Sequence, residues 1–113
     1  MKVIRNSLIP FPGYIAVTLW PFVFVRRRLE QYYTARVDRH ERIHGRQQLE
    51  MLILPFYLWY ALEWLVRLIV LRNGHRAYRA ISFEQEAYVH EDNPDYLDAR
   101  RPYAWLRYLA RGW

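Results

Sequence analysis

Two short runs near the N-terminus combine β-branched and aromatic residues. The first, Tyr14–Trp20, follows Pro12 and Gly13, and the second, Phe22–Val25, follows Pro21. Residues of these types favour extended backbone, and a proline restricts such a segment to a bend or a sheet edge. The pattern predicts two short strands, which form either a hairpin or one strand bent at Pro21.

From Leu29 onward the composition changes to charged residues and good helix formers. Thr34 is a suitable N-cap for a helix that runs toward Ile53, and Pro55 should kink that helix or begin a new one. The segment Phe56–Leu71 places its large apolar side chains at spacings of three and four, which is the period of one helix face. The members of this stripe are Tyr57, Tyr60, Trp64, Leu68 and Leu71, and the three aromatic ones are expected in the core.

Further signals divide the second half of the chain. The pair Asn73–Gly74 should end the preceding helix, with the glycine in the left-handed C-cap conformation. Ser82 and Gln85 match a capping box at the start of the next helix. The segment Tyr96–Leu109 fits a last amphipathic helix, interrupted at Pro102.

Short strands followed by helices place the chain in the α+β class. Its 113 residues suffice for one hydrophobic core but not for two. We therefore predict a single domain over residues 1–113, in which a hairpin or pair of short strands precedes three to four helices.

The strongest chemical signal is the sequence His40-Glu41-Arg42-Ile43-His44, an HExxH motif within a predicted helix. Residues four apart on a helix point the same way, so both imidazoles can reach one metal ion. Glu41 lies about 100° around the helix axis from His40, where it can act on a water instead of the metal. The motif predicts a zinc site in which Glu41 is the general base.

A third protein ligand is required for a catalytic zinc site. The chain contains no cysteine, so that ligand is a histidine or a carboxylate, and the later helix carries Glu84 and Glu86. These two residues would point about 200° apart on a helix, so only one of them can face the ion.

The motif His40–His44, followed some forty residues later by Glu84-Gln85-Glu86-Ala87, resembles the gluzincin group of zinc peptidases. The resemblance implies a minimal zincin-like domain in which Glu84 is the third ligand and Glu86 its neighbour, the alternative ligand. The group has an aspartate at the position of Tyr88 that supports a ligating histidine. Asp38, Asp92 and Asp95 are the candidates to replace it. Residues Leu8–Leu109 are also similar to a small bacterial family of this minimal type.

Several other residues are weaker candidates. Gln47 follows the second histidine by three residues and is suited to orient an imidazole, although a surface position is as compatible with the sequence. His90 and Tyr88 are candidates to stabilise the transition state, as are His75 and Tyr78. For each of them an exposed or packing role is the simpler interpretation.

The net charge is +6, and all but one of the seventeen basic residues are arginines. These charges are spread along the chain without any nucleic-acid-binding signature, so we expect no specific nucleic-acid partner. Leu49–Leu71 is long enough to span a membrane but contains Glu50, Glu63 and Arg67, which favours a core helix with a polar face. The expected location is the cytoplasm, with contact at the membrane surface as the alternative.

The sequence therefore predicts a zinc-dependent metallopeptidase that acts on a peptide or protein substrate through water activated by zinc and Glu41. The alternative is a non-catalytic protein of the same fold that binds zinc or associates peripherally with a membrane. Substrate specificity and oligomeric state stay open at this point.

Overall fold

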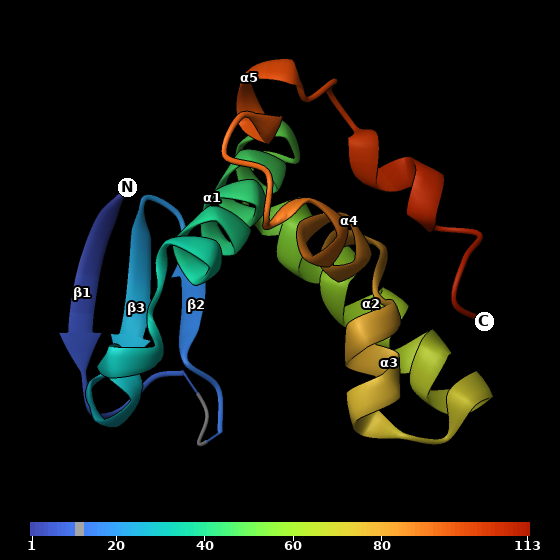
Figure 1. The fold of residues 1–113 in the computed structure, drawn as a ribbon. Helices are drawn as coiled ribbons and strands as arrows, with labels where there is room; N and C mark the ends of the chain where they lie inside the picture. The colour runs from blue at the N-terminus through green and yellow to red at the C-terminus, as the bar shows by residue number, and fades with distance from the viewer. Residues whose placement is uncertain (11–12) are drawn as a thin grey trace.

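The computed structural model describes residues 1–10 and 13–113, so Pro12, expected ahead of the first strand, lies outside the described residues. A small sheet stands at one end, and the helices extend away from it (Figure 1). Its strands are β1 Lys2–Asn6, β2 Ala16–Leu19 and β3 Phe22–Arg26. The helices are the 3-10 helix η1 Arg27–Tyr32, then α1 Ala35–Glu50, α2 Leu54–Leu71, α3 Gly74–Ala80, α4 Ser82–His90, α5 Tyr96–Ala99 and the 3-10 helix η2 Ala104–Tyr108. The predicted α+β class is confirmed.

The sheet has the strand order β1-β3-β2. Strands β2 and β3 form the predicted antiparallel hairpin, in which Leu19 pairs with Phe22. Strand β1 runs parallel to β3 and was missed, because its five residues show neither a long apolar run nor a turn that would delimit them. Since β3 is central, β2 forms one free edge of the sheet.

Helix α1 begins as predicted: the Thr34 side chain accepts a hydrogen bond from the Val37 amide at 3.4 Å. The helix ends at Glu50, three residues before the expected limit. Leu52 and Ile53 then take positive φ angles of 59° and 66°, and Pro55 lies in the first turn of α2, where no amide donor is needed. A new helix therefore begins at Leu54, directly before the proline.

Two of the capping predictions are wrong. Helix α2 ends with Arg72 in the left-handed conformation, while Asn73 caps the following helix by accepting from the Arg76 amide at 2.9 Å. Ser82 and Gln85 form no capping box: Ser82 donates its hydroxyl to Glu63, and Gln85 donates to backbone carbonyls, including that of Ala80. The side chains of Ser82 and Gln85 thus form hydrogen bonds with other groups instead of capping their own helix.

The predicted last helix over Tyr96–Leu109 is present only as two short pieces, α5 and η2, on either side of Pro102. Trp105 and Tyr108 of η2 are buried. Trp105 belongs to the core cluster with Phe56, Ile81 and Phe83, and Tyr57, Tyr60 and Trp64 of the predicted stripe pack against this cluster. The aromatic stripe is therefore a core face, as expected.

Helix α2 carries its two charged side chains on its buried side, beside aromatic residues of the core. Among the described residues it is the one helix long and apolar enough to cross a membrane by length and composition, yet only 17% of it is buried. Its buried residues are Phe56, Glu63 and Arg67. The prediction of a core helix therefore holds only for the face of α2 that packs against the protein, and Glu63 and Arg67 lie on that buried face.

Glu63 and Arg67 form an ion pair of 2.8 Å that joins three segments. Glu63 also accepts from the amide and hydroxyl of Ser82 at the start of α4. Arg67 donates to the carbonyl oxygens of Leu109 and Arg111 near the C-terminus, at 3.0 and 2.8 Å. The pair therefore holds α4 and the C-terminal segment against α2.

Replacing Arg67 with methionine is expected to lower the free energy of unfolding by about 3–5 kcal/mol, because Glu63 would remain buried without its cation. Chemical denaturation monitored by circular dichroism measures the change. Arg46→Met is the matched control, since Arg46 is an exposed arginine of α1. Equal stability of the two variants would contradict a structural role for the buried pair.

Candidate metal centre

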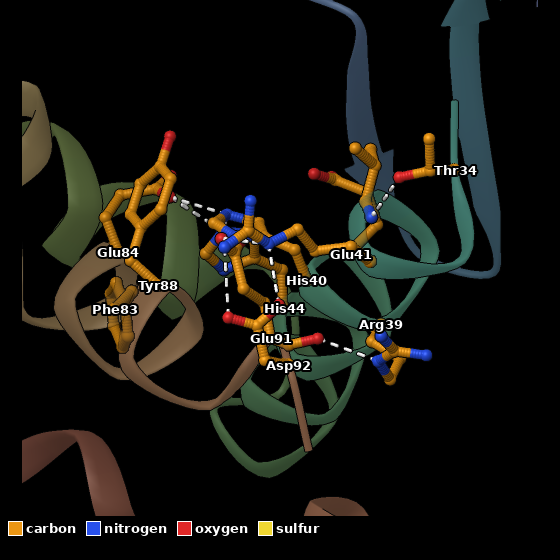
Figure 2. A network of polar contacts seen from close by, with 12 residues as sticks. Thr34, Arg39, His40, Glu41, His44, Phe83, Glu84, Tyr88, Glu91 and Asp92 are labelled. Atoms are coloured by element: carbon orange, nitrogen blue, oxygen red, sulfur yellow. Dashed lines mark hydrogen bonds and ion pairs between the residues drawn. The ribbon is translucent and has the colours of Figure 1, made fainter. Parts of the chain in front are cut away.

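Two histidines from α1 and one glutamate from α4 converge in the interior (Figure 2). His40 and His44 are one helical turn apart, and their Nε2 atoms lie 3.2 Å from each other. Glu84 Oε1 lies 3.1 Å from His40 Nε2 and 3.0 Å from His44 Nε2. All three side chains are buried, and their ligand atoms are arranged so that one metal ion could be held among them.

The spacing of these atoms is close to that of the ligands in a tetrahedral metal site. Zinc binds imidazole nitrogen and carboxylate oxygen at about 2.0–2.2 Å, so two ligand atoms of a tetrahedron lie about 3.3 Å apart. The three observed separations, 3.0, 3.1 and 3.2 Å, are close to that value. A small outward movement of the side chains is sufficient to accommodate the ion.

The outer nitrogen of each imidazole faces an acceptor. His40 Nδ1 lies 2.7 Å from a carboxylate oxygen of Glu91, and His44 Nδ1 lies 2.8 Å from Gln47 Oε1. The Gln47 amide is fixed in this orientation because its nitrogen donates to the Phe83 carbonyl and to Glu86, each at 3.0 Å. An acceptor at Nδ1 favours the tautomer that is protonated there, so that in a metal-bound state each Nε2 lone pair would be directed at the ion.

Glu84 is oriented by a tyrosine. The Tyr60 hydroxyl donates to Glu84 Oε2 at 2.7 Å, which leaves Oε1 directed at the two histidines. Tyr60 was expected only as a core residue. Nothing in the sequence distinguishes a core tyrosine whose hydroxyl reaches a ligand from one that merely packs.

The metal-free cluster is a strongly coupled set of charges. Burial disfavours the charged imidazole, but the Glu84 carboxylate outweighs burial and raises the pKa of His44 to about 9. Burial likewise opposes ionisation of Glu84, yet the two imidazoles lower the pKa of that carboxyl below its ordinary value. In the absence of metal a proton on His44 offsets the negative charge, as a cation does in a metal site.

Glu41 lies beside this cluster, on a different side of α1 from the two histidines (Figure 2). Thr18 of β2 places its hydroxyl 2.9 Å from Glu41 Oε1, whereas Oε2 has no donor among the described residues. Burial raises the pKa of Glu41, although both histidines act in the opposite direction. This carboxylate is thus fixed at one oxygen and free at the other.

Two hollows meet at Glu41. The larger, about 620 Å³, lies between β2 and α2 and reaches His44 and Glu84. The smaller, about 320 Å³, reaches His40. The larger hollow has a mainly apolar lining, which includes Val17, Leu19, Phe56, Tyr57, Tyr60 and Trp64. A ligand therefore has access to the cluster along the edge of the sheet.

Two of the remaining residues that the sequence offered as site candidates, Glu86 and His90, lie outside the cluster. Glu86 does not join the cluster, since its carboxylate is bonded to Arg100, Tyr96 and Gln47. His90 stacks on Tyr96 at 3.8 Å, away from the histidine pair.

Two tyrosines and a histidine lie beside the cluster. The Tyr88 ring packs 4.4 Å from that of His40, and its hydroxyl meets that of Tyr78 at 3.0 Å. Tyr78 lines both hollows, whereas His75 lines only the smaller one. Tyr78 is therefore the better placed of the candidate donors.

Glu91, and not one of the three candidate aspartates, contacts the outer nitrogen of His40. Asp38 is bonded to Tyr33 and Arg42, and Asp92 to Arg36. The signal for Glu91 is its position seven residues after Glu84, which returns it to nearly the same face of a helix two turns later. That spacing is visible in the sequence.

Comparison of the chain with protein-family models, with curated proteins and with solved structures found no match. The assignment of the site therefore rests on its own geometry.

Replacing Glu91 with alanine should weaken zinc binding by about 10–100-fold, the usual effect of losing a hydrogen-bond partner of a ligating histidine. Competition with a zinc-sensitive dye measures the affinity. Asp92→Ala is the control, because this neighbouring carboxylate contacts Arg36 but neither histidine. An unchanged affinity in Glu91→Ala would show that the contact with His40 does not support metal binding.

Proposed function

We propose that the protein is a zinc-dependent peptidase, with the metal held by His40, His44 and Glu84. The observation that carries the proposal is the meeting of three ligand atoms with a partly free carboxylate, Glu41, at the end of an open hollow. A structural metal site is closed by four protein ligands, whereas a catalytic one keeps a position open. Three protein ligands beside a hollow fit the catalytic type.

The roles of the chain's own groups follow from their contacts. A bound zinc ion would acidify water and polarise a substrate carbonyl. Glu41 Oε2 accepts a proton from the attacking water, and the Thr18 hydroxyl holds the carboxylate in place through Oε1. Glu41 then returns the proton to the leaving amine. Tyr78 donates a hydrogen bond to the oxyanion, since burial raises its pKa and keeps the hydroxyl protonated.

Strand β2 offers an edge to an extended peptide. The carbonyl of Ile15 accepts a hydrogen bond from the amide of Arg26 at the end of β3. The backbone amides and carbonyls of the odd-numbered residues of β2 therefore point toward β3, and those of the even-numbered residues point toward the free edge. Gln48 occupies part of this outer edge by bonding the Thr18 carbonyl and the Trp20 amide, both at 2.8 Å. Both polar groups of Ala16 and the Thr18 amide are left for a substrate strand next to Glu41.

The lining of the larger hollow indicates the substrate. Its aromatic side chains from α2 form an apolar wall that would receive a large apolar side chain of the peptide. The smaller hollow is more polar, with Arg36, His75 and Glu91 in its lining. The substrate is therefore a peptide that carries a bulky apolar residue next to the cleaved bond.

The zinc-loaded protein should cleave a mixed peptide library and yield new termini beside Phe, Leu, Met, Tyr or Trp, as read by mass spectrometry. A chelator should stop the cleavage and added zinc should restore it. Cleavage sites without any apolar preference would contradict the role of the hollow. Fully bound zinc with no cleavage of any peptide would favour the non-catalytic zinc-binding protein instead.

A further inference from the structure

A continuous apolar surface runs along the outside of α2. We call it the outer stripe; its members are Leu54, Leu58, Leu62, Leu65, Val66 and Ile69. Each of these side chains is at least 42% exposed, and Leu54, Leu58 and Ile69 are about 70% exposed. Their spacing of three and four places them on one side of the helix, whose 18 residues extend about 27 Å. No charged residue interrupts the stripe.

The arrangement is the reverse of a helix that faces water. The ionisable residues of α2, Glu63 and Arg67, point into the protein and are bonded there to Ser82 and to the C-terminal carbonyls. A water-facing helix places its charges outward and its leucines inward. An exposed apolar surface of this extent marks a site of contact with a partner or a membrane.

The charges around the stripe indicate which contact it makes. Two exposed arginines directly follow the stripe and have no acidic partner among the described residues: Arg72 at the C-terminal end of α2, and Arg76 of α3. By contrast, nine of the eleven acidic side chains are engaged by hydrogen bonds or ion pairs, and only Asp95 and Asp98 have no partner among the described residues. A second copy of the chain would bring the same positive charges against this surface, whereas an anionic bilayer complements them.

We propose that the outer stripe of α2 docks into the interface of an anionic lipid bilayer, with the helix axis parallel to the surface. The leucines enter the boundary between headgroups and acyl chains, and Arg72 and Arg76 contact lipid phosphates. A parallel orientation follows because a spanning α2 would carry Glu63 and Arg67, with the segments bonded to them, into hydrocarbon.

Flotation of the full chain with vesicles tests the proposal. The wild type should float with phosphatidylcholine vesicles that contain phosphatidylglycerol, and much less with phosphatidylcholine alone. The double variant Leu58→Glu/Ile69→Glu should bind at least about a hundredfold more weakly, because two apolar anchors become anions. Arg72→Gln/Arg76→Gln should weaken binding about tenfold or more on the anionic vesicles, and high salt should act in the same direction.

Leu8→Glu and Val89→Glu are the matched controls, since Leu8 and Val89 are highly exposed apolar residues outside α2. They should bind as the wild type does, and an unchanged circular dichroism spectrum in every variant verifies the fold. Equal binding by the stripe variant and the wild type would overturn the proposal, as would a wild type that binds no vesicle. A lipid-free dimer that the stripe variant dissociates would assign the surface to a second copy. Resistance to both high salt and alkaline carbonate would indicate a spanning helix instead.

Discussion

Glu41→Gln is expected to keep the bound zinc and to lower the rate of peptide hydrolysis by about 10²–10⁴-fold. Glutamine retains the shape of the side chain and an oxygen for the Thr18 hydroxyl, 2.9 Å away in the wild type, but it has no basic carboxylate. Losing a positioned general base has an effect of this size. The three proposed ligands are not altered, so the metal content should stay at about one zinc per chain.

The assay compares initial rates on a peptide cleaved by the wild type, with zinc content measured on the same samples. Glu30→Gln is the control, because Glu30 is an exposed carboxylate that pairs with Arg5 and not with the residues of the cluster. It should hydrolyse peptide at the wild-type rate. Equal rates for Glu41→Gln and the wild type would remove Glu41 from the mechanism. Loss of zinc in Glu41→Gln would assign it to the metal instead of the water.

Replacing either His40 or His44 with alanine should reduce zinc affinity by more than about a hundredfold. Structural zinc sites bind with about 10–16 kcal/mol from four ligands, or about 3 kcal/mol for each, which corresponds to that factor. The buried Glu84 would also lose one of the two imidazoles that lower its pKa. Zinc retained after dialysis, measured by atomic emission, gives a direct comparison.

His75→Ala and His90→Ala are the matched controls for this loss. His75 is exposed, and His90 contacts Tyr96 and Tyr108 away from the cluster. Both variants should hold zinc as the wild type does. If all four histidine variants retained equal zinc, the ion would have to be bound elsewhere in the chain.

The parts of the fold that depend on local pattern could be predicted from the sequence. Thr34 caps α1, Pro55 lies in the first turn of α2, and the Tyr14–Val25 region forms the β2–β3 hairpin. Each depends on backbone preferences that act within a few residues. The proximity of His40 and His44 follows for the same reason, because a helix places residues four apart on one side.

Features set by tertiary contact were missed. Strand β1 is recognisable only by its parallel pairing with β3, in which each residue of β1 pairs with the residue twenty positions later in the chain. Ser82 was expected to cap its own helix, but Glu63 accepts its hydroxyl instead. The polarity of α2 was misjudged because a sequence shows where charges lie on a helix, not which side the rest of the chain covers.

For the candidate site too, some residues could be predicted from the sequence and their contacting partners could not. Glu84 was selected over Glu86 by resemblance alone, and the structure places Glu84 with the histidines and Glu86 with Arg100. The contacts of Tyr60 with Glu84 and of Glu91 with His40 join residues 24 and 51 positions apart. Hydrogen-bond partners at such separations depend on how the helices pack, which no local pattern encodes.

The most direct test of the proposed metal site is a crystal structure of the zinc-loaded protein with anomalous diffraction measured on both sides of the zinc absorption edge. We expect one anomalous peak about 2.0–2.2 Å from His40 Nε2, His44 Nε2 and Glu84 Oε1, with a fourth position facing the hollow beside Glu41. A peak elsewhere, or a zinc ion closed off by a fourth protein ligand, would contradict the proposed catalytic site.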